Sequence, residues 1–392
     1  MPLTLPSQPR RQNRLLFLVD QAPLASVRRL VLILLPLNAL LIGVTYLEGS
    51  WIIEGAGIGL FEDGVQAANI GGQLFAIWAA SRLLQRIRSL HEPIKAAVHS
   101  VATADNQIEE VLRRVDERLA PANDFIDIET PTARRMAMVV VTAMIALVFF
   151  FQVYLPWQDT SATTTWVLSP RQFPVSWACG ILWNVWTFGV VAASALWVVG
   201  SSALGVFSAV RGLIADGVLR IVPLAPDGRG GVAFLGDLSL AQSLVLGSGV
   251  PWLVMWVLLF GLDNRALLVG APIYLSVLTV LFFLPLSGIS RAMRDAKQRD
   301  LERFSRLFNL AYLDLESPNE RGADKQEPQL PSHSRVQDVA QLHSLYRMAQ
   351  DMPVWPFDVQ TLRRFASLVG IPLIAILQQF VSDLPWKNLF PR

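Results

Sequence analysis

The sequence contains little cysteine, histidine or charge. Among its 392 residues there are one cysteine and four histidines, and only 16% of the residues are charged. The single cysteine, Cys179, excludes an internal disulfide and any metal site built from several thiolates. Soluble domains carry about 25% charged residues. The low charge and the 53% of hydrophobic residues therefore predict a membrane protein. The net charge of +2 is too small to indicate a nucleic acid as partner.

Sequence patterns typical of enzymes are also missing. The four histidines follow no metal-binding spacing such as H-E-x-x-H, and there is neither a Walker loop nor a G-x-S-x-G elbow. Asp237 lies near a membrane entrance, but an aspartyl mechanism needs a second carboxylate facing it, which the sequence does not locate. We therefore expect no enzymatic activity, no catalytic residue, no cofactor and no metal.

Long apolar segments are abundant. A helix that spans the hydrocarbon layer needs about 20 apolar residues. Six segments meet or approach this length: 30–47, 136–155, 176–210, 241–262, 266–289 and 365–381. The segment 176–210 is uncharged throughout and, as one helix, would reach roughly 50 Å, so we expect a bend at Gly200–Ser202. These segments predict an all-α, polytopic membrane helix bundle.

A seventh segment, 64–81 (GVQAANIGGQLFAIWAAS), carries no charge but is rich in glycine and amides. Basic residues accumulate on the cytoplasmic side of membrane proteins. If residues 64–81 cross the membrane and the N-terminus is cytoplasmic, all basic residues fall inside except Arg171, Arg265, Lys387 and Arg392. If they do not cross, this asymmetry is lost. The sequence therefore predicts about seven spans. For the last one, 365–381, it leaves two alternatives: the segment crosses the membrane, or it enters and returns to the same side.

Segment 64–81 has two distinct faces. Small residues recur every four positions and would let another helix approach closely: Ala68, Gly72, Ala76 and Ala80. The amides Gln66, Asn69 and Gln73 follow a three- and four-residue spacing and share another face. These amides either hold the bundle together through hydrogen bonds or line a polar pathway, within one chain or at an oligomer axis. In both interpretations Asn38 and Asn184 are candidate partners.

A stretch of carboxylates lies between the first two spans. Glu48, Glu54, Glu62 and Asp63 have no basic residue among them. Such a group either forms an outer mouth that attracts cations, with Glu54, Glu62 and Asp63 as its residues, or is a solvated loop.

Three spans contain a Gly-x-Pro sequence. The pairs are Gly249 with Pro251, Gly270 with Pro272, and Gly370 with Pro372. Because proline lacks a backbone donor and clashes with the preceding turn, each pair is expected to kink or break its helix. Broken helices bind ions or substrates in transporters, although prolines are also frequent in membrane helices generally.

The remaining chain predicts cytoplasmic parts and the following boundaries. Apolar residues from Ile94 to Leu119 predict one long amphipathic helix, with Asp105 interrupting the repeat, and two further such helices follow residue 290. The basic group Arg291, Arg294, Lys297 and Arg299 would contact anionic lipid. The regions are an N-terminal segment 1–29, two spans in 30–81, a helical region 82–135, four spans in 136–289 with loop 211–240, cytoplasmic helices in 290–364 with linker 316–333, and a last segment 365–392.

The loop 211–240 contains a Pro-Asp-Gly turn followed by two glycines. Its motif residues are Asp227, Arg229, Gly230 and Gly231. Glycine permits positive φ, and successive backbone N–H groups in such a turn can bind an anion. The loop is therefore either a tight turn or a site for a lipid phosphate or another small anion.

Two stretches carry a resemblance to a known group of proteins. They are PLAPDGRGGVAFLGD and MPVWPFDVQTLRRFASLVGIPLIAILQQF. Over residues 217–392 the chain resembles a family of uncharacterised bacterial polytopic membrane proteins with a P-D-x-x-G-G loop between spans. That family usually has histidine where this chain has Ala225. The resemblance implies a bacterial inner-membrane protein and supplies no chemistry.

Two hypotheses on function follow. The first is a channel or transporter-like protein, a homo-oligomer that moves an ion or small solute along the amide face. The second is a membrane-anchored assembly or signalling component whose cytoplasmic helices bind a protein partner. Both place the chain in the inner membrane with a cytoplasmic N-terminus, with lipid as a partner and no nucleic acid. A polar second span and three Gly-x-Pro sequences favour the first.

Overall fold

The structure is a computed structural model, and most of the chain is described in it. The described residues are 18–19, 22–53, 58–99, 105–154, 166–167, 169–222, 227–260, 265–316, 333–357 and 359–383. In these residues the regular elements are all helical. The all-α prediction is confirmed.

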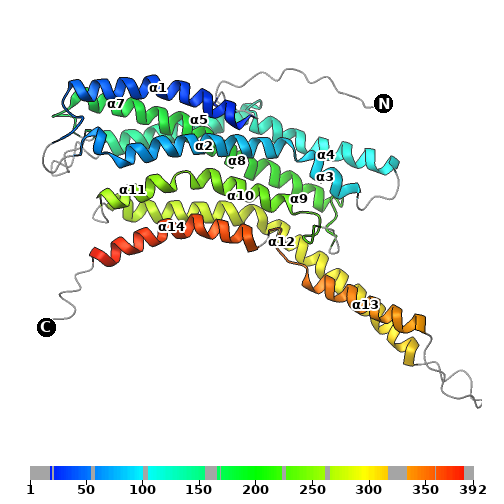
Figure 1. Cartoon of the computed structure of the whole chain (residues 1–392). Coiled ribbons are helices and arrows are strands. Elements are labelled where there is room, and N and C mark those ends of the chain that lie inside the picture. Colours follow the sequence, from blue (N-terminus) through cyan, green and yellow to red (C-terminus); the bar gives the residue numbers. More distant parts are fainter. Residues whose placement is uncertain are drawn as a thin grey trace, which may run out of the picture.

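Long helices lie along one another in a bundle (Figure 1). The first three are α1 (Pro23–Leu47), α2 (Gly64–Arg88) and α5 (Pro131–Phe149), which continues as η3 (Phe150–Tyr154). One continuous helical segment follows: α7 (Pro174–Asn184), η4 (Val185–Ala192), α8 (Ala193–Ser201), η5 (Ser202–Val206) and α9 (Phe207–Ala215). The others are α10 (Phe234–Gly247), α11 (Val250–Phe260), the first part of α12 (Arg265–Glu316) and α14 (Val359–Asp383).

Five helical segments are long and apolar enough to cross a membrane. They are Pro23–Leu47, Glu109–Phe149, Pro174–Ala215, Phe234–Met255 and Pro272–Leu313. Large apolar side chains are exposed on the outer surface of the bundle, as expected where lipid replaces water: Leu32, Leu35, Val139, Val277 and Leu284. The protein is therefore a membrane-embedded helix bundle. Helix α2 is not among the five, because its amides and glycines lower its hydropathy.

Helix α2 lies inside the bundle. It packs against α1, α8, α10, α11 and η4. Its small residues allow these close approaches: Ala76 and Ala80 are buried, and a Cβ added at Gly72 would lie 3.0 Å from the carbonyl oxygen of Ser248. Most of its buried residues belong to the main hydrophobic core, with Ile77 and Leu83 fully buried.

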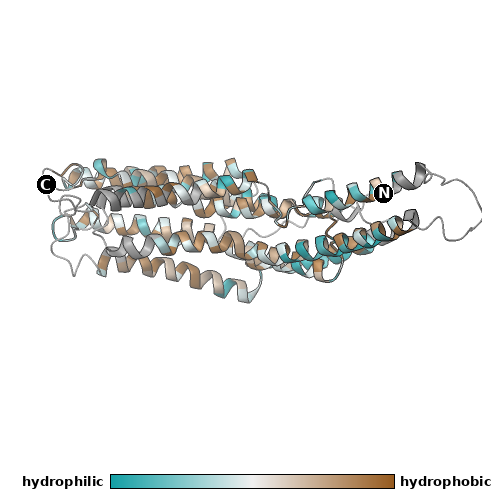
Figure 2. Ribbon diagram, turned by 90° about the horizontal axis from the view of Figure 1, so that it is seen from below, coloured by the Kyte–Doolittle hydropathy of each residue, from teal (hydrophilic) through white to brown (hydrophobic). Residues whose placement is uncertain are grey.

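The bundle has two chemically different ends. We call the end that holds Glu48, Glu62 and Asp63 the mouth end. We call the opposite end, which holds Arg88, the arm end, because α12 continues past the bundle there and pairs with α13 (His333–Asp351) (Figure 1). This α12–α13 hairpin is the arm. Figure 2 shows hydrophobic residues concentrated along the bundle and hydrophilic residues along the arm.

The prediction of a single amphipathic helix from Ile94 to Leu119 is wrong. The chain forms two helices instead, α3 (His91–His99) and α4 (Asp105–Ile126), which pack against each other. Asp105, which interrupts the apolar repeat, is the first residue of α4, and aspartate favours helix starts over helix interiors. The apolar positions Ile94 and Val115 are fully buried, so the pattern indicated the buried face correctly but not the connectivity.

The segment 176–210 stays helical at Gly200–Ser202, where a bend was expected. It continues as a helix through two π-helical stretches, η4 and η5, the second of which begins at Ser202. A π-turn inserts a residue into the helix without interrupting it, so the chain changes its side-chain register and remains hydrogen-bonded in an apolar environment.

The Gly-x-Pro sequences behave differently from one another. At Gly249–Pro251 the helix is interrupted, since α10 ends at Gly247 and α11 begins at Val250. Helices α12 and α14 continue through Gly270–Pro272 and Gly370–Pro372. A proline removes only one backbone donor, which a long apolar helix tolerates when its neighbours pack around it.

Candidate functional site

The amide stripe of α2 lies in the interior of a single chain. The side chains of Gln66, Asn69 and Gln73 are 8%, 7% and 3% exposed. Gln73 Nε2 donates a hydrogen bond to Thr187 Oγ1 in η4 at 3.2 Å, and that hydroxyl donates to the carbonyl oxygen of Trp183 at 2.9 Å. The stripe thus faces the continuous segment α7–α9 instead of the outer surface.

A second buried amide lies deeper in the bundle, toward the arm end. Gln242 in α10 is 1% exposed, and its Nε2 donates to Ser202 Oγ at 2.6 Å. Ser202 Oγ donates in turn to the carbonyl oxygen of Val199 at 2.8 Å. Gln242 was not among the site residues predicted from the sequence. The sequence did contain a signal for it: Gln242 lies in the apolar segment 241–262, and a glutamine is costly in such a membrane segment unless it faces the protein interior.

Both amides contact a hydroxyl on a π-helical stretch. Thr187 belongs to η4 and Ser202 is the first residue of η5. In α7–α9 these two hydroxyls accept the side-chain hydrogen bonds from α2 and α10. Single π-turns inside α-helices occur frequently at functional sites. We call the two contacts, Gln73 with Thr187 and Gln242 with Ser202, the outer and the inner station.

Several buried polar atoms of α2, α7 and α10 have no hydrogen-bond partner among the described residues. They are Gln66 Nε2, Gln73 Oε1, Ser81 Oγ, Trp183 Nε1 and Gln242 Oε1. A polar group in an apolar interior costs free energy unless it is hydrogen-bonded, and native proteins leave few such groups unpaired. Water or a polar solute satisfies groups of this kind. These atoms and the stations together form what we call the polar file.

Asn38 and Asn184 do not join the polar file through their side-chain donors. Asn38 Nδ2 donates to the carbonyl oxygen of Leu34 at 2.8 Å, and Asn184 Nδ2 donates to that of Gly180 at 3.1 Å. Each bond returns to the turn of the residue's own helix. The amide therefore satisfies its donor locally in the membrane.

At the mouth end, Asp63 and Glu48 are structural caps. Asp63 Oδ1 accepts from the backbone N–H of Gln66 at the start of α2, and Oδ2 accepts from Trp166 Nε1 at 2.8 Å. Glu48 accepts from the backbone N–H groups of Val175 and Ser176 at the start of α7. Carboxylates stabilise helix N-termini in this way. Glu62 is exposed, and Glu54 lies outside the described residues.

The pKa values of the two capping carboxylates are shifted in opposite directions. Burial raises the pKa of Asp63 above its usual range, although the hydrogen bonds from Trp166 and Gln66 act against this. Burial also acts to raise the pKa of Glu48, but the hydrogen bonds that Ser176 and Val175 donate outweigh it, so this pKa is lowered.

The glycine-rich loop binds its own carboxylate. Asp227 Oδ1 accepts from the backbone N–H groups of Arg229 and Gly231, both at 2.9 Å, and Oδ2 accepts from that of Ala233. Gly228, Gly230 and Gly231 have positive φ, as this turn requires. The backbone donors proposed for an anion or lipid phosphate are therefore occupied by Asp227, which favours the tight turn.

The two stretches on which the family resemblance rests lie together at the arm end. A Cβ at Gly236 would overlap the carbonyl oxygen of Pro356, and a Cβ at Gly230 would lie 2.8 Å from Met352 Cε. Lys297 Nζ donates to the carbonyl oxygens of Gln350 and Met352. We call residues 352–357 the strap. It connects the arm to α14, whose Phe365 stacks on Phe282 of α12.

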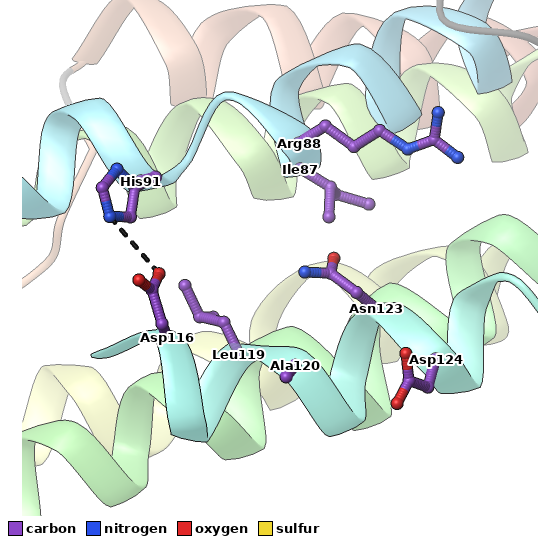
Figure 3. Close-up of a pocket in the computed structure, with 8 residues that line it drawn as sticks. All are labelled: Ile87, Arg88, His91, Asp116, Leu119, Ala120, Asn123 and Asp124. Atoms are coloured by element: carbon purple, nitrogen blue, oxygen red, sulfur yellow. Dashed lines mark ion pairs between the residues drawn. The ribbon is translucent and has the colours of Figure 1, made fainter. Parts of the chain in front are cut away.

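A groove at the arm end separates α2 and α3 from α4 (Figure 3). Its volume is about 280 Å³, and its lining residues are Ile87, Arg88, His91, Asp116, Leu119, Ala120, Asn123 and Asp124. His91 Nε2 lies 3.3 Å from Asp116 Oδ1, and Arg88 pairs with Asp127 at 3.0 Å. These two contacts join α2 and α3 to α4.

In the part of the chain that the structure describes, no group of three or more His, Cys, Asp or Glu residues is placed to hold a metal ion. Comparison of the chain with protein-family models, with curated proteins and with solved structures found no match.

Proposed function

We propose that the protein is a channel or transporter-like membrane protein that moves an ion or small polar solute along the polar file. The observation that carries the proposal is the set of buried, unpartnered amide atoms at Gln66, Gln73 and Gln242. Polar side chains in membrane segments tend to face cavities or pathways, and an anchor needs none. The two π-helical stretches beside the stations support the same function.

The proposal includes seven spans in a bacterial inner membrane, with the arm end in the cytoplasm. Supporting it, helices α1 and α2 pack together, and the ends of α2, α9 and the middle of α12 carry basic residues at the arm end: Arg82, Arg86, Arg88, Arg211, Arg291 and Arg294. The positive-inside rule assigns such an end to the cytoplasm. Labelling of single cysteines at Glu62 and Arg82, in a Cys179→Ala background, tests the crossing of α2; labelling of both from one side contradicts it.

Flux through proteoliposomes tests the pathway. We expect the purified chain to raise solute permeability, and Gln66→Leu or Gln73→Leu to lower it, because leucine keeps the side-chain volume and removes the hydrogen-bonding groups. Gln85→Leu is the matched control, since Gln85 lies on the exposed face of the same helix. Flux that is equal in wild type and in both interior variants contradicts the proposal.

A second function, protein binding by the arm, is favoured by one observation. The arm extends past the bundle (Figure 1). It exposes large apolar side chains, among them Leu310, Leu313 and Met348. Exposed apolar patches mark interaction sites. Replacing Leu310 and Leu313 by serine should release a co-purifying protein partner without altering solute flux. Retention of every partner by this variant argues against the arm as the binding element.

A further inference from the structure

The polar file contains no charged side chain in its buried part. Among the residues whose burial the structure describes, no Asp, Glu, Lys, Arg or His is buried. The half-buried Asp63 lies at the mouth end, where both of its carboxylate oxygens accept hydrogen bonds. A solute inside the file therefore meets amides and hydroxyls and no formal countercharge.

This composition disfavours ions. Moving an unpaired charge from water into a protein interior is very costly. Potassium filters repay that cost with rings of carbonyl oxygens that replace the hydration shell. Here the unpartnered amide oxygen at each station is Gln73 Oε1 or Gln242 Oε1, and the amide nitrogen beside it is a donor that already makes one hydrogen bond to a hydroxyl. One neutral oxygen does not replace a hydration shell.

The free groups instead match a neutral molecule with both donors and acceptors. Gln66 Nε2 and Trp183 Nε1 are free donors, whereas Gln73 Oε1 and Gln242 Oε1 are free acceptors, and Ser81 Oγ can act as either. Along α7–α9 the two stations are about 22 Å apart at ~1.5 Å per residue, so they lie at different depths of the membrane.

We propose that the polar file binds and passes a small uncharged solute that both donates and accepts hydrogen bonds, such as water, a polyol or urea, and that Gln73 and Gln242 bind it in succession. This inference rests on the proposed transport function and narrows its substrate class. The π-helical stretches contribute by holding Thr187 and Ser202 against the amide nitrogens, while each amide oxygen is left without a protein partner among the described residues and can accept a hydrogen bond from the solute.

The test uses the full chain in proteoliposomes, with stopped-flow light scattering for water, glycerol and urea and an ion-indicator assay for K⁺ and Cl⁻. Wild type should raise the permeability of at least one neutral solute and leave ion flux at the level of protein-free vesicles. Gln73→Leu and Gln242→Leu should each lower the excess permeability by about tenfold, because a lost hydrogen bond of ~1.4 kcal/mol corresponds to that factor. Gln85→Leu should have no effect.

The outcomes separate this inference from the transport function itself. Ion flux that depends on Gln73 and Gln242, with neutral permeability at the vesicle baseline, overturns the inference and leaves transport in place. If a neutral solute permeates and neither variant lowers its flux, Gln73 and Gln242 do not bind the solute. Absence of flux for every solute overturns transport and the inference together. If Gln242→Leu fails to fold, Ser202→Ala replaces it, because it removes the partner of the amide and retains the small side-chain volume.

Discussion

The side-chain amide of Gln73 in α2 donates a hydrogen bond to the hydroxyl of Thr187 in η4 across the interior of the bundle, at 3.2 Å. Thr187 also donates to the carbonyl oxygen of Trp183, so the two partners depend on their shared hydrogen bond to different extents. Removing the threonine hydroxyl leaves a whole amide without a partner. Removing the amide leaves the hydroxyl with its backbone bond.

We therefore predict that Thr187→Val destabilises the protein more than Gln73→Leu. An unpaired buried polar group costs about 1–3 kcal/mol. Interhelical hydrogen bonds in membranes contribute only about 0.6 kcal/mol on average. The free energy of unfolding, measured by SDS titration in mixed micelles, checks the order. In the double variant the cost should be below that of Thr187→Val alone, and a larger cost for Gln73→Leu contradicts the arrangement.

We predict that the folded state becomes less stable as pH rises because of Asp63. Because its pKa is raised in the folded protein, the stability linked to this group is greatest below the unfolded pKa and is lost as pH increases through the folded value. Asp63→Asn keeps an acceptor for the N–H of Gln66 and abolishes the titration. Thermal unfolding in detergent should show this variant gaining stability relative to wild type between pH 4 and pH 7, whereas exposed Glu62→Gln should follow wild type.

Glu48 should show the opposite dependence. Its pKa is lowered below the ordinary 4.5, so its contribution is present above that value and is lost as pH falls through the folded pKa. Glu48→Gln should lower stability at pH 7 by about 1 kcal/mol, which is less than the ~1.5–3 kcal/mol of a hydrogen bond to a charged group, because Glu48 is only half-buried and solvent screens its charge. The difference from wild type should shrink below pH 4. A difference that is constant with pH excludes the charged cap.

Gly236 should be intolerant of any side chain. Its backbone lies against Pro356 of the strap, where a Cβ would overlap the carbonyl oxygen. Gly236→Ala should cost about 1–3 kcal/mol, as overpacking does, and should expose the strap to proteolysis. Gly200→Ala is the matched control, because nothing lies within 4 Å of a Cβ there and alanine favours a helix. Equal stability of the two variants contradicts the packing of the strap on α10.

Cysteine labelling should distinguish a wetted file from a dry polar core. In a Cys179→Ala background, Asn69→Cys and Gln73→Cys should react with a small membrane-impermeant thiosulfonate, since both positions are buried on the amide face of α2 and that face is proposed to be wetted. Phe75→Cys should not react, because Phe75 is exposed on the outer surface of the bundle, where lipid is expected. Labelling of Phe75→Cys alone reverses the proposed orientation of α2.

The sequence by itself determined which parts of the chain are helical and which helix carries polar residues into the bundle. Apolar runs of membrane length and the spacing of Gln66, Asn69 and Gln73 follow from residue type and helical periodicity, which are local properties. The burial of Ile94 and Val115 was determined in the same way. Their placement on two helices depended on where the chain reverses, which periodicity does not report.

Only the tertiary structure decided how the polar groups are paired. Gln73 meets Thr187, and Gln242 meets Ser202, across separations of more than a hundred and of forty residues in the chain. Asp227 binds the backbone of its own loop, while Asn38 and Asn184 return to their own helices. The physical reason is that a buried donor or acceptor takes the nearest partner that close packing brings to it, and packing is set by the bundle as a whole.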